Sequence, residues 1–479
     1  MNAEQRSESI QVVIDTGNAP SQDTGHYAAT FAALRSTFFA NKTRDISWRK
    51  QQLLALKTML VTHEQDIHRA LNQDLGKCET EARTSETGFL LSDLKHTLKH
   101  IDSWADLRHV STPLAAQPAR SYLQPEPLGV VLIIGAWNYP VQLLLAPLIA
   151  ALAAGNCAIV KPSELAPASS ALMASLLPQY LEDDAVAVVE GAKEETQALL
   201  ALPFDHIFYT GGEAVGKIVM SAAAKHLTPV TLELGGKSPC IVDASCRLDV
   251  TARRIVWGKW MNCGQTCIAP DYILIEKGFA EAFLAALERE ITKQYGPEPL
   301  QSKDYGHIVN TRHYERLCQL IADLQCRIGG ERDDGTRKLA PAVVLNPPAD
   351  STLMQEEIFG PVLPVIELEN IEDSIGFIRG RAKPLALYLF SEDHGFRDKV
   401  LTQTSAGSVC VNDTMMFMTN ANLPFGGVGS SGMGRYHGQY GFDTFSHLKS
   451  VMVRASKFDV AVRYAPYSRF KLWLLKKLL

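Results

Sequence analysis

Apolar residues recur at helical spacing over the first hundred residues of this chain. Between about residues 26 and 108, positions such as Leu53, Leu56 and Leu60 repeat at intervals that place them along one side of a helix. Two prolines then interrupt the pattern, and residues 119–128 are expected to form an extended arm. This part of the chain is therefore predicted to be helical up to the arm.

Beyond residue 129, short apolar runs alternate with longer helical stretches. Residues 130–134 are all apolar, as expected for a strand buried on both faces. One alternating set closes at residues 230–233, and a second begins at residues 239–242. The alternation implies right-handed crossovers and so predicts an α/β fold with parallel, doubly wound sheets. The other expected strands and helices cover residues 143–154, 158–160, 169–181, 186–189, 206–209, 214–226, 249–261, 272–275, 279–295, 385–390 and 408–411.

The composition is that of an ordinary globular protein with 479 residues, 46% of them apolar and 21% charged. This length is enough for two packed domains. The net charge of -5 provides no basic field, so nucleic acid is not expected as a partner. The nine scattered cysteines favour reduced thiols in a cytoplasmic protein. Residues 1–25 are polar, lack the apolar core of a signal peptide, and are expected to form a disordered tail.

Candidate metal ligands are weak in this sequence. His96 and His100 stand at a helical ligand spacing, but they lack the adjoining glutamate of a zinc motif. Cys263 has no Cys-x-x-Cys partner that would complete a metal or redox site. A solvated helix face explains the two histidines better, and no metal is expected.

The segment Gly264-Gln265-Thr266-Cys267 is a glycine-rich break after a predicted helix. Most cysteines of a large protein are buried fillers, but a cysteine in such a break is a candidate nucleophile toward a carbonyl carbon. Glu233 follows a predicted parallel strand, where open α/β sheets place their sites, and a glutamate there can activate water. Together the two residues predict covalent chemistry on an aldehyde that ends in an acid.

These segments, read together, resemble the aldehyde dehydrogenase superfamily from about residue 31 to about residue 454. Two of them look most like its class 3 branch, which includes fatty and aromatic aldehyde dehydrogenases. The motifs that carry the resemblance are Trp137-Asn138-Tyr139-Pro140, Glu233-Leu234-Gly235-Gly236-Lys237-Ser238-Pro239, the cysteine segment, Glu357-Ile358-Phe359-Gly360-Pro361, and Pro424-Phe425-Gly426-Gly427-Val428-Gly429 running on to Tyr436-His437-Gly438.

The resemblance implies NAD(P)-dependent oxidation of an aldehyde to a carboxylic acid through a thiohemiacetal and a thioester. Cys267 would be the nucleophile, and the Asn138 amide with the Cys267 N–H would stabilise the oxyanion. Glu233 would be the general base that hydrolyses the thioester. The substrate would be a medium- or long-chain aliphatic or an aromatic aldehyde. Tyr139, Cys263 and His437 are expected to line its pocket.

The resemblance also implies where NAD or NADP would bind. The turn from Gly211 to Gly216 links a predicted strand to a helix and would lie beside the pyrophosphate, although glycines in such a turn can serve packing alone. The remaining cofactor residues are Lys161 and Glu164 at the adenosine ribose, Leu234, Glu357 at the nicotinamide ribose, and Phe359 near the nicotinamide, although Phe359 could equally be a core residue.

The implied architecture is a Rossmann-type parallel-sheet cofactor domain, a related α/β catalytic domain and a small oligomerisation arm. The arm would combine residues 119–128 with a strand near residues 451–453 and would support a homodimer. The boundaries expected are 1–25 for the tail, 26–233 for the cofactor domain with the arm interrupting it at about 110–128, 234–436 for the catalytic domain, and 437–479 for a C-terminal return.

Two other functions stay open at this level. One is a coenzyme A-acylating enzyme, although relatives of that kind typically lack the glutamate found here at position 233. The other is a catalytically idle binding or structural protein built on the same fold, which the intact set of Cys267, Glu233 and Asn138 argues against.

The C-terminal residues 468–479 combine apolar and basic side chains at helical spacing. They are far fewer than the ~20 apolar residues that span a bilayer. One interpretation is a helix docked on the surface of the protein itself. The other is a short helix at the substrate entrance that also makes weak, peripheral contact with anionic lipid.

Overall fold

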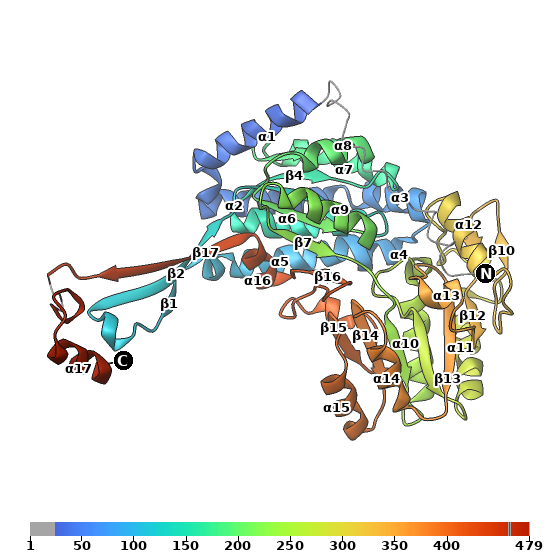
Figure 1. Ribbon diagram of the computed structural model, residues 1–479. Helices are drawn as coiled ribbons and strands as arrows, with labels where there is room; N and C mark the ends of the chain where they lie inside the picture. Colours follow the sequence, from blue (N-terminus) through green and yellow to red (C-terminus); the bar gives the residue numbers. More distant parts are fainter. Residues whose placement is uncertain (1–23, 458, 460, 479) are drawn as a thin grey trace, which may run out of the picture.

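The computed structural model describes residues 24–457, 459 and 461–478 (Figure 1). Of the predicted tail, residues 1–23 lie outside this described part. Helix α1 (Thr24–Phe39) already begins at Thr24, so the tail prediction is wrong for residues 24 and 25. The helix is anchored by the buried Phe31 and Leu34, and it extends upstream of them.

The first large sheet has six strands in the order β16-β7-β6-β3-β4-β5. The strands β7, β6, β3, β4 and β5 are parallel to their neighbours, and every residue of β3 is buried, as its continuous apolar run requires. These strands are β3 (Val130–Ile134), β4 (Cys157–Lys161), β5 (Val186–Val188), β6 (His206–Thr210), β7 (Val230–Glu233) and the antiparallel β16 (Gly432–Met433). The helices between them are α6 (Gln142–Ala154), α7 (Pro167–Tyr180), α8 (Lys193–Leu200) and α9 (Glu213–Ala224).

The second large sheet also has six strands, in the order β12-β13-β9-β8-β14-β15, and all of them are parallel. The predicted α/β class with parallel sheets is therefore confirmed. The strands are β8 (Pro239–Val242), β9 (Tyr272–Glu276), β12 (Ala342–Leu345), β13 (Val362–Leu368), β14 (Ala386–Phe390) and β15 (Ser408–Val411). Its helices include α10 (Leu248–Trp260), α11 (Ala280–Tyr295), α12 (Thr311–Leu320), α14 (Asp373–Arg379) and α15 (His394–Gln403).

The two sheets are linked by a short segment and by a return of the chain. β8 begins soon after β7 ends, and β16 pairs with β7 so that Gly432 lies opposite Glu233. The chain therefore rejoins the first sheet before the boundary predicted at residue 437. The first sheet is also covered by helices α2 (Ile46–Thr62), α3 (Glu64–Leu75), α4 (Glu79–Ala82), α5 (Gly88–Ala105) and α16 (Gly438–Thr444), several of which pack against α6 and α7.

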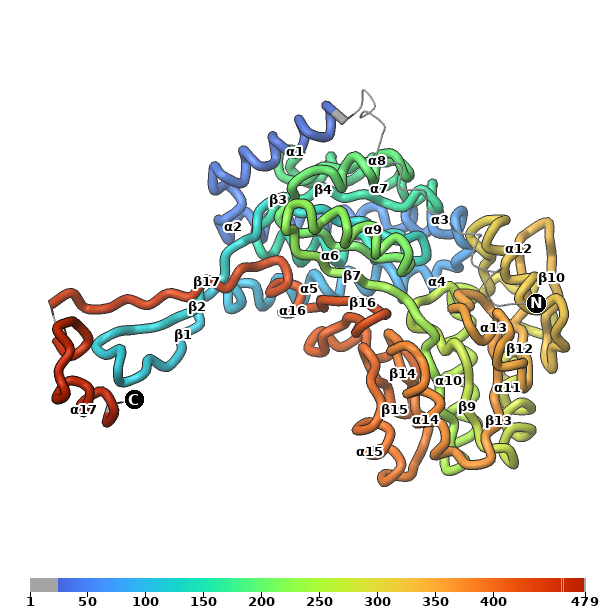
Figure 2. Tube along the Cα trace, viewed as in Figure 1, coloured from blue at the N-terminus to red at the C-terminus, as the bar shows by residue number. Residues whose placement is uncertain are grey.

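A three-stranded antiparallel arm projects from the body of the molecule (Figure 2). It consists of β1 (Arg108–Val110), β2 (Ala119–Pro127) and β17 (Ser446–Arg454), in the order β1-β2-β17. All nine residues of β17 pair with β2, so distant parts of the sequence form one hairpin-like ribbon.

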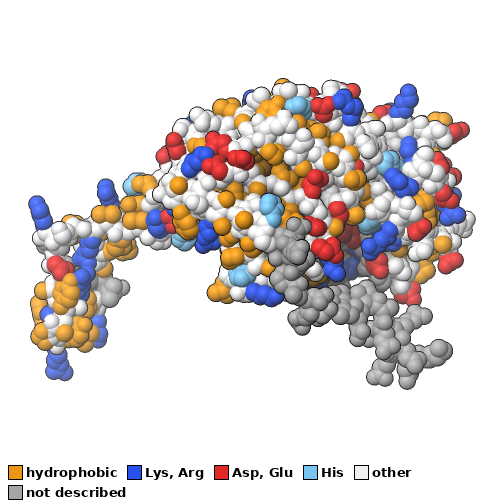
Figure 3. Space-filling view, turned by 90° about the horizontal axis from the view of Figure 1, so that it is seen from above, with side chains coloured by type: hydrophobic (Ala, Val, Ile, Leu, Met, Phe, Trp, Pro, Cys, Tyr) orange, Lys and Arg blue, Asp and Glu red, His pale blue; other side chains and the backbone are white. Residues whose placement is uncertain are grey.

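Helix α17 (Arg469–Leu478) lies at the far end of this arm, away from both large sheets (Figure 2). The predicted helix is thus present, but it is not docked on the body of its own chain. Figure 3 shows apolar side chains gathered at the end of the arm. Among them, Phe470, Leu472 and Trp473 are 68%, 55% and 51% exposed. Among the described residues, no helix is both long enough and apolar enough to cross a bilayer.

Candidate active site

Cys267 follows helix α10 and a short turn, η5 (Met261–Gly264), that reverses the backbone. Asn262, Cys263 and Gly264 all have positive φ angles, of 53°, 52° and 74°. A Cβ atom at Gly264 would collide with the carbonyl oxygen of Gly360, so this position requires glycine. The turn therefore places Cys267 beyond the helix end rather than within its last turn.

Cys267 lies on the wall of a cavity of about 280 Å³. The cavity is lined mostly by apolar side chains, with methionines prominent among them. The lining residues are Thr84, Ser85, Phe89, Tyr139, Gln142, Leu143, Trp257, Met261, Thr266, Cys267, Ile268, Met415, Met416, Met418, Thr419, Phe425 and Tyr436. Most of them were missed at the sequence level, although the methionine-rich run at residues 415–418 was a visible signal.

Glu233 is the last residue of β7 and is almost completely buried. Neither of its carboxylate oxygens has a hydrogen-bond partner among the described residues. Burial away from water raises the pKa of Glu233 well above its ordinary value, because the charged form loses its hydration. An unpaired buried carboxyl group of this kind is typical of a functional site.

Glu233 and Cys267 lie close enough in the structure to interact electrostatically. Burial raises the pKa of the Cys267 thiol to about 12, with further contributions from the carboxyl groups of Glu357 and Glu233. The thiol is therefore neutral in this state. Glu233, from the first sheet, therefore affects the pKa of Cys267, which belongs to the unit built on the second sheet.

Asn138 lies in the loop after β3, against the cysteine segment. Its side-chain Nδ2 donates a hydrogen bond to the backbone oxygen of Gln265, at 3.0 Å. The neighbouring Tyr139 hydroxyl is 2.7 Å from the hydroxyl of Thr266, the residue before Cys267. The loop that carries Asn138 is therefore joined directly to the loop that carries Cys267.

Two residues predicted for the substrate pocket do not line this cavity. Cys263 is buried, and its surroundings include the ring of Tyr305. His437 lines a separate, very small cavity with Asp93 and Trp104, on the other side of Tyr436. Only Tyr139 of the three predicted pocket residues lines the cavity, because Cys263 is buried beside Tyr305 and the His437 ring stacks on Phe425, at 5.4 Å between centroids.

Of the predicted cofactor residues, Glu357 lines a second cavity, of about 520 Å³, whereas Lys161, Glu164, Gly211, Gly216, Leu234 and Phe359 do not. Gly235, Gly236 and Glu357 line it, together with Glu213 from the first turn of α9. A Cβ atom at Gly235 would collide with the Glu357 carboxyl group, so the glycine allows this close approach. Burial raises the pKa of Glu357 to about 8. The cavity, the glycines and the acidic acceptor fit a ribose with free hydroxyl groups.

The other predicted cofactor residues flank the carboxyl ends of the first sheet. Lys161 ends β4, and its Nζ is 3.2 Å from Glu164 Oε2. The backbone N–H of Gly211 donates to the backbone oxygen of Glu233, and Gly211 leads into α9, whose N-terminus is a favourable place for an anion. A Cβ atom at Gly216 would lie 2.8 Å from Leu234 Cδ2, so that glycine also serves close packing.

Phe359 has a positive φ of 49° and is half-buried. Its ring packs edge-on against Trp137, at 5.2 Å between centroids. No group of three or more His, Cys, Asp or Glu side chains within the described ranges is arranged to hold a metal ion.

The chain matches the model of the aldehyde dehydrogenase family over residues 11–451. It is 49% identical over 440 residues to rat "Aldehyde dehydrogenase family 3 member A2", covering 91% of each chain. It is 47% identical over 439 residues to rat "Aldehyde dehydrogenase, dimeric NADP-preferring", covering 91% of this chain and 97% of that one. A solved structure, the "Substrate bound state of Staphylococcus Aureus AldH", superimposes with a TM-score of 0.92 at 44% identity, covering 94% and 99% of the two chains.

Proposed function

Because this chain belongs to the aldehyde dehydrogenase family, and its class 3 resemblance is confirmed, we propose that Cys267 is the nucleophile of an NAD(P)-dependent aldehyde oxidation. The observation that carries the assignment is the placement of Cys267 in the wall of an apolar cavity, in electrostatic contact with Glu233. The thiol must lose its proton before its sulfur attacks the aldehyde carbon.

Asn138 supplies one donor for the oxyanion that this attack creates. A side-chain amide has two N–H bonds, and one of them is engaged by the Gln265 carbonyl. The second N–H and the backbone N–H of Cys267 are the proposed oxyanion donors. Removing one such donor in other enzymes costs about 3–4 kcal/mol of transition-state stabilisation. The bound nicotinamide cofactor supplies the hydride acceptor.

Glu233 then acts on the thioester that remains on Cys267. Its carboxylate takes a proton from water as the water attacks the thioester carbon, and the acid leaves. The unpaired, buried carboxyl group supports this role, since a raised pKa makes its carboxylate a stronger base. Hydrolysis by a resident base favours a free acid as product over transfer to coenzyme A.

Two substitutions separate these roles. Cys267→Ala should abolish turnover while cofactor binding persists, with Cys318→Ala on α12 as a matched control. Glu233→Gln should retain a burst of close to one reduced cofactor per site, followed by a steady state about 10²-fold slower. Substantial turnover by Cys267→Ala would refute Cys267 as the nucleophile. Loss of the burst without a trapped thioester would refute the role of Glu233.

NAD is the proposed preferred cofactor, with NADP tolerated. Glu164 is paired with Lys161, and a carboxylate beside the adenosine ribose suits free hydroxyls and repels a 2′-phosphate. Its side chain is 46% exposed, which leaves it room to turn away when NADP binds. The measurement is kcat/KM with each cofactor, and a preference of about tenfold or more for NADP would overturn this assignment. Glu164→Gln should reduce the difference in kcat/KM between NAD and NADP.

The proposed substrate is an apolar aldehyde of medium or long chain, or an aromatic one. Trp257, Met261 and the methionines at residues 415–418 provide a flexible apolar wall, and Met416 and Trp257 are partly exposed to solvent. Methionine side chains adapt to ligands of varied shape, which supports a range of chain lengths.

The proposed assembly is a homodimer formed through the arm. β17 is an edge strand of the arm sheet, with exposed Met452 and Val453. An open edge with apolar side chains is a template for pairing with another chain. The relative named as dimeric supports a second copy as that partner.

A further inference from the structure

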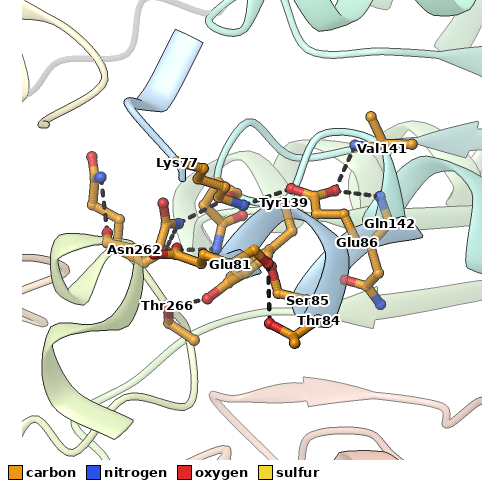
Figure 4. A network of polar contacts seen from close by, with 12 residues as sticks. Lys77, Glu81, Thr84, Ser85, Glu86, Tyr139, Val141, Gln142, Asn262 and Thr266 are labelled. Atoms are coloured by element: carbon orange, nitrogen blue, oxygen red, sulfur yellow. Dashed lines mark hydrogen bonds and ion pairs between the residues drawn. The ribbon is translucent and has the colours of Figure 1, made fainter. Parts of the chain in front are cut away.

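A buried ion pair lies behind the loop that carries Asn138 (Figure 4). Lys77 Nζ and Glu86 Oε1 are 2.6 Å apart, and both side chains are 0% exposed. Lys77 follows helix α3, in the loop that leads to α4, and Glu86 belongs to the short segment η3 (Arg83–Thr87). Neither residue lines the cavity with Cys267, so neither can touch the aldehyde there.

The two residues of the ion pair bind opposite ends of the loop formed by residues 138–142. Lys77 Nζ donates to the backbone oxygen of Asn138 at 3.0 Å and lies 3.9 Å from the centre of the Tyr139 ring. The second oxygen of Glu86 accepts from the backbone N–H groups of Val141 and Gln142, at 3.1 and 2.8 Å. The positions of residues 138–142 are thereby tied to one pair of charges.

Asn262 connects the same backbone oxygen to the cysteine loop. Its Nδ2 donates to the oxygen of Asn138 at 2.8 Å and to that of Gln265 at 3.1 Å. Gln265 in turn accepts from the Asn138 side chain. The Asn138 carbonyl is therefore fixed by Lys77 on one side and by Asn262 on the other.

A buried ion pair is an expensive way to gain stability. Removing two charges from water costs several kcal/mol per ion, and apolar residues of similar volume often serve as well or better. What an ammonium group adds is a short, directed and charge-assisted bond to a chosen oxygen. Here that oxygen is the backbone oxygen of Asn138, the residue whose side-chain amide is the proposed oxyanion donor.

We infer that Lys77, with Glu86 as its counterion, is a positioning residue that holds the Asn138 amide where the oxyanion forms. This rests on the proposed role of Asn138. Lys77 acts through the Asn138 backbone and does not touch the substrate. A displacement of the amide by about 1 Å would slow the chemical step by about 10²-fold, whereas the nicotinamide cofactor would still bind.

The test is a double-mutant cycle on the single-turnover rate of hydride transfer. Asn138→Ala should slow this step about 10²- to 10³-fold. Lys77→Met should slow it about 10- to 100-fold in the wild-type background. In the Asn138→Ala background, Lys77→Met should cost no more than about twofold, because the group it positions is already absent.

Three controls separate a loss of positioning from a loss of folding. Cofactor affinity and thermal stability report whether each variant is folded. Lys277→Met removes an ion pair of the same 2.6 Å length on the surface and should leave the rate unchanged. Lys77→Met combined with Glu86→Gln removes both charges of the pair and should show the same non-additivity if Lys77→Met alone does not fold.

The two proposals fail in different ways. If the losses from Asn138→Ala and Lys77→Met multiply, Lys77 has only a general structural role and the inference is overturned. The same holds if Lys77→Met leaves hydride transfer unchanged while Asn138→Ala slows it. If Asn138→Ala leaves hydride transfer unchanged, the proposed oxyanion role of Asn138 is overturned, and the inference with it.

Discussion

At the scale of single residues, burial disfavours the charged forms of both proposed reacting groups. The pKa of Cys267 is raised to about 12 by burial and by the nearby carboxyl groups, and that of Glu233 lies well above its ordinary value through burial. Each group acts in its deprotonated form. Desolvation therefore disfavours formation of the Cys267 thiolate and the Glu233 carboxylate. It also makes each of them a stronger base once it has formed.

These directions predict that kcat/KM rises with pH. Below a raised pKa, the deprotonated fraction of a group grows about tenfold per pH unit, so activity should climb from about pH 7 to about pH 9.5. Measurement of kcat/KM over this range checks the prediction. The burst rate of Glu233→Gln should keep the part of the rise that belongs to Cys267. A flat or falling profile in the wild-type enzyme would contradict the assignment of Cys267.

At the scale of elements, the carboxyl ends of parallel strands decide which loops can meet. Asn138 follows β3 and Glu233 ends β7, on either side of β6 in the same sheet. Parallel strands share one active edge, so both residues could be assigned to it before their contacts were known. The terminal helix is different, because nothing in its own periodicity states which surface it meets.

The position of α17 changes what its removal should do. The helix stands at the tip of the arm that is proposed to reach a second copy, and it exposes Phe470, Leu472 and Trp473. Deleting Arg469 to Leu479 should spare activity on short aldehydes and lower it on long-chain ones, because in the proposed homodimer the arm carries this apolar helix to the second copy and not to the cavity of its own chain. It should also weaken sedimentation with anionic vesicles in a salt-sensitive way.

A panel of aldehydes of rising chain length, assayed as kcat/KM for the full chain and the deletion variant, checks this expectation. Lys476→Gln with Lys477→Gln isolates the electrostatic part, because it keeps the apolar side chains. An unchanged chain-length preference, together with no vesicle binding by the full-length protein, would exclude the membrane contact.

At the scale of the whole molecule, the proposed active site lies where the two sheets meet. Asn138 and Glu233 come from the first sheet, and Cys267 comes from the unit built on the second. The hydrogen bond from Asn138 to Gln265 crosses between them. Neither sheet alone contains the proposed set of nucleophile, oxyanion donor and base, so the packing of the two is part of the chemistry.

The sequence by itself determined the parallel strands that are apolar throughout. A strand buried on both faces needs apolar side chains at every position, so the apolar run at residues 130–134 predicts β3 from local sequence alone. β13 was missed because Pro364 and Glu367 interrupt its apolar pattern. β12 was also missed. The proposed roles of Cys267, Glu233 and Asn138 were also predicted from sequence.

Only the tertiary structure decided what surrounds those residues. Lys77 and Asn138 are 61 positions apart, and no local pattern links a lysine to a distant backbone oxygen. Cys263 lies beside Tyr305 and the His437 ring stacks on Phe425, so neither lines the predicted pocket, and α17 lies away from the body because it follows β17 along the arm. Periodicity reports how much of a residue is buried, whereas partners are fixed by how separate elements pack.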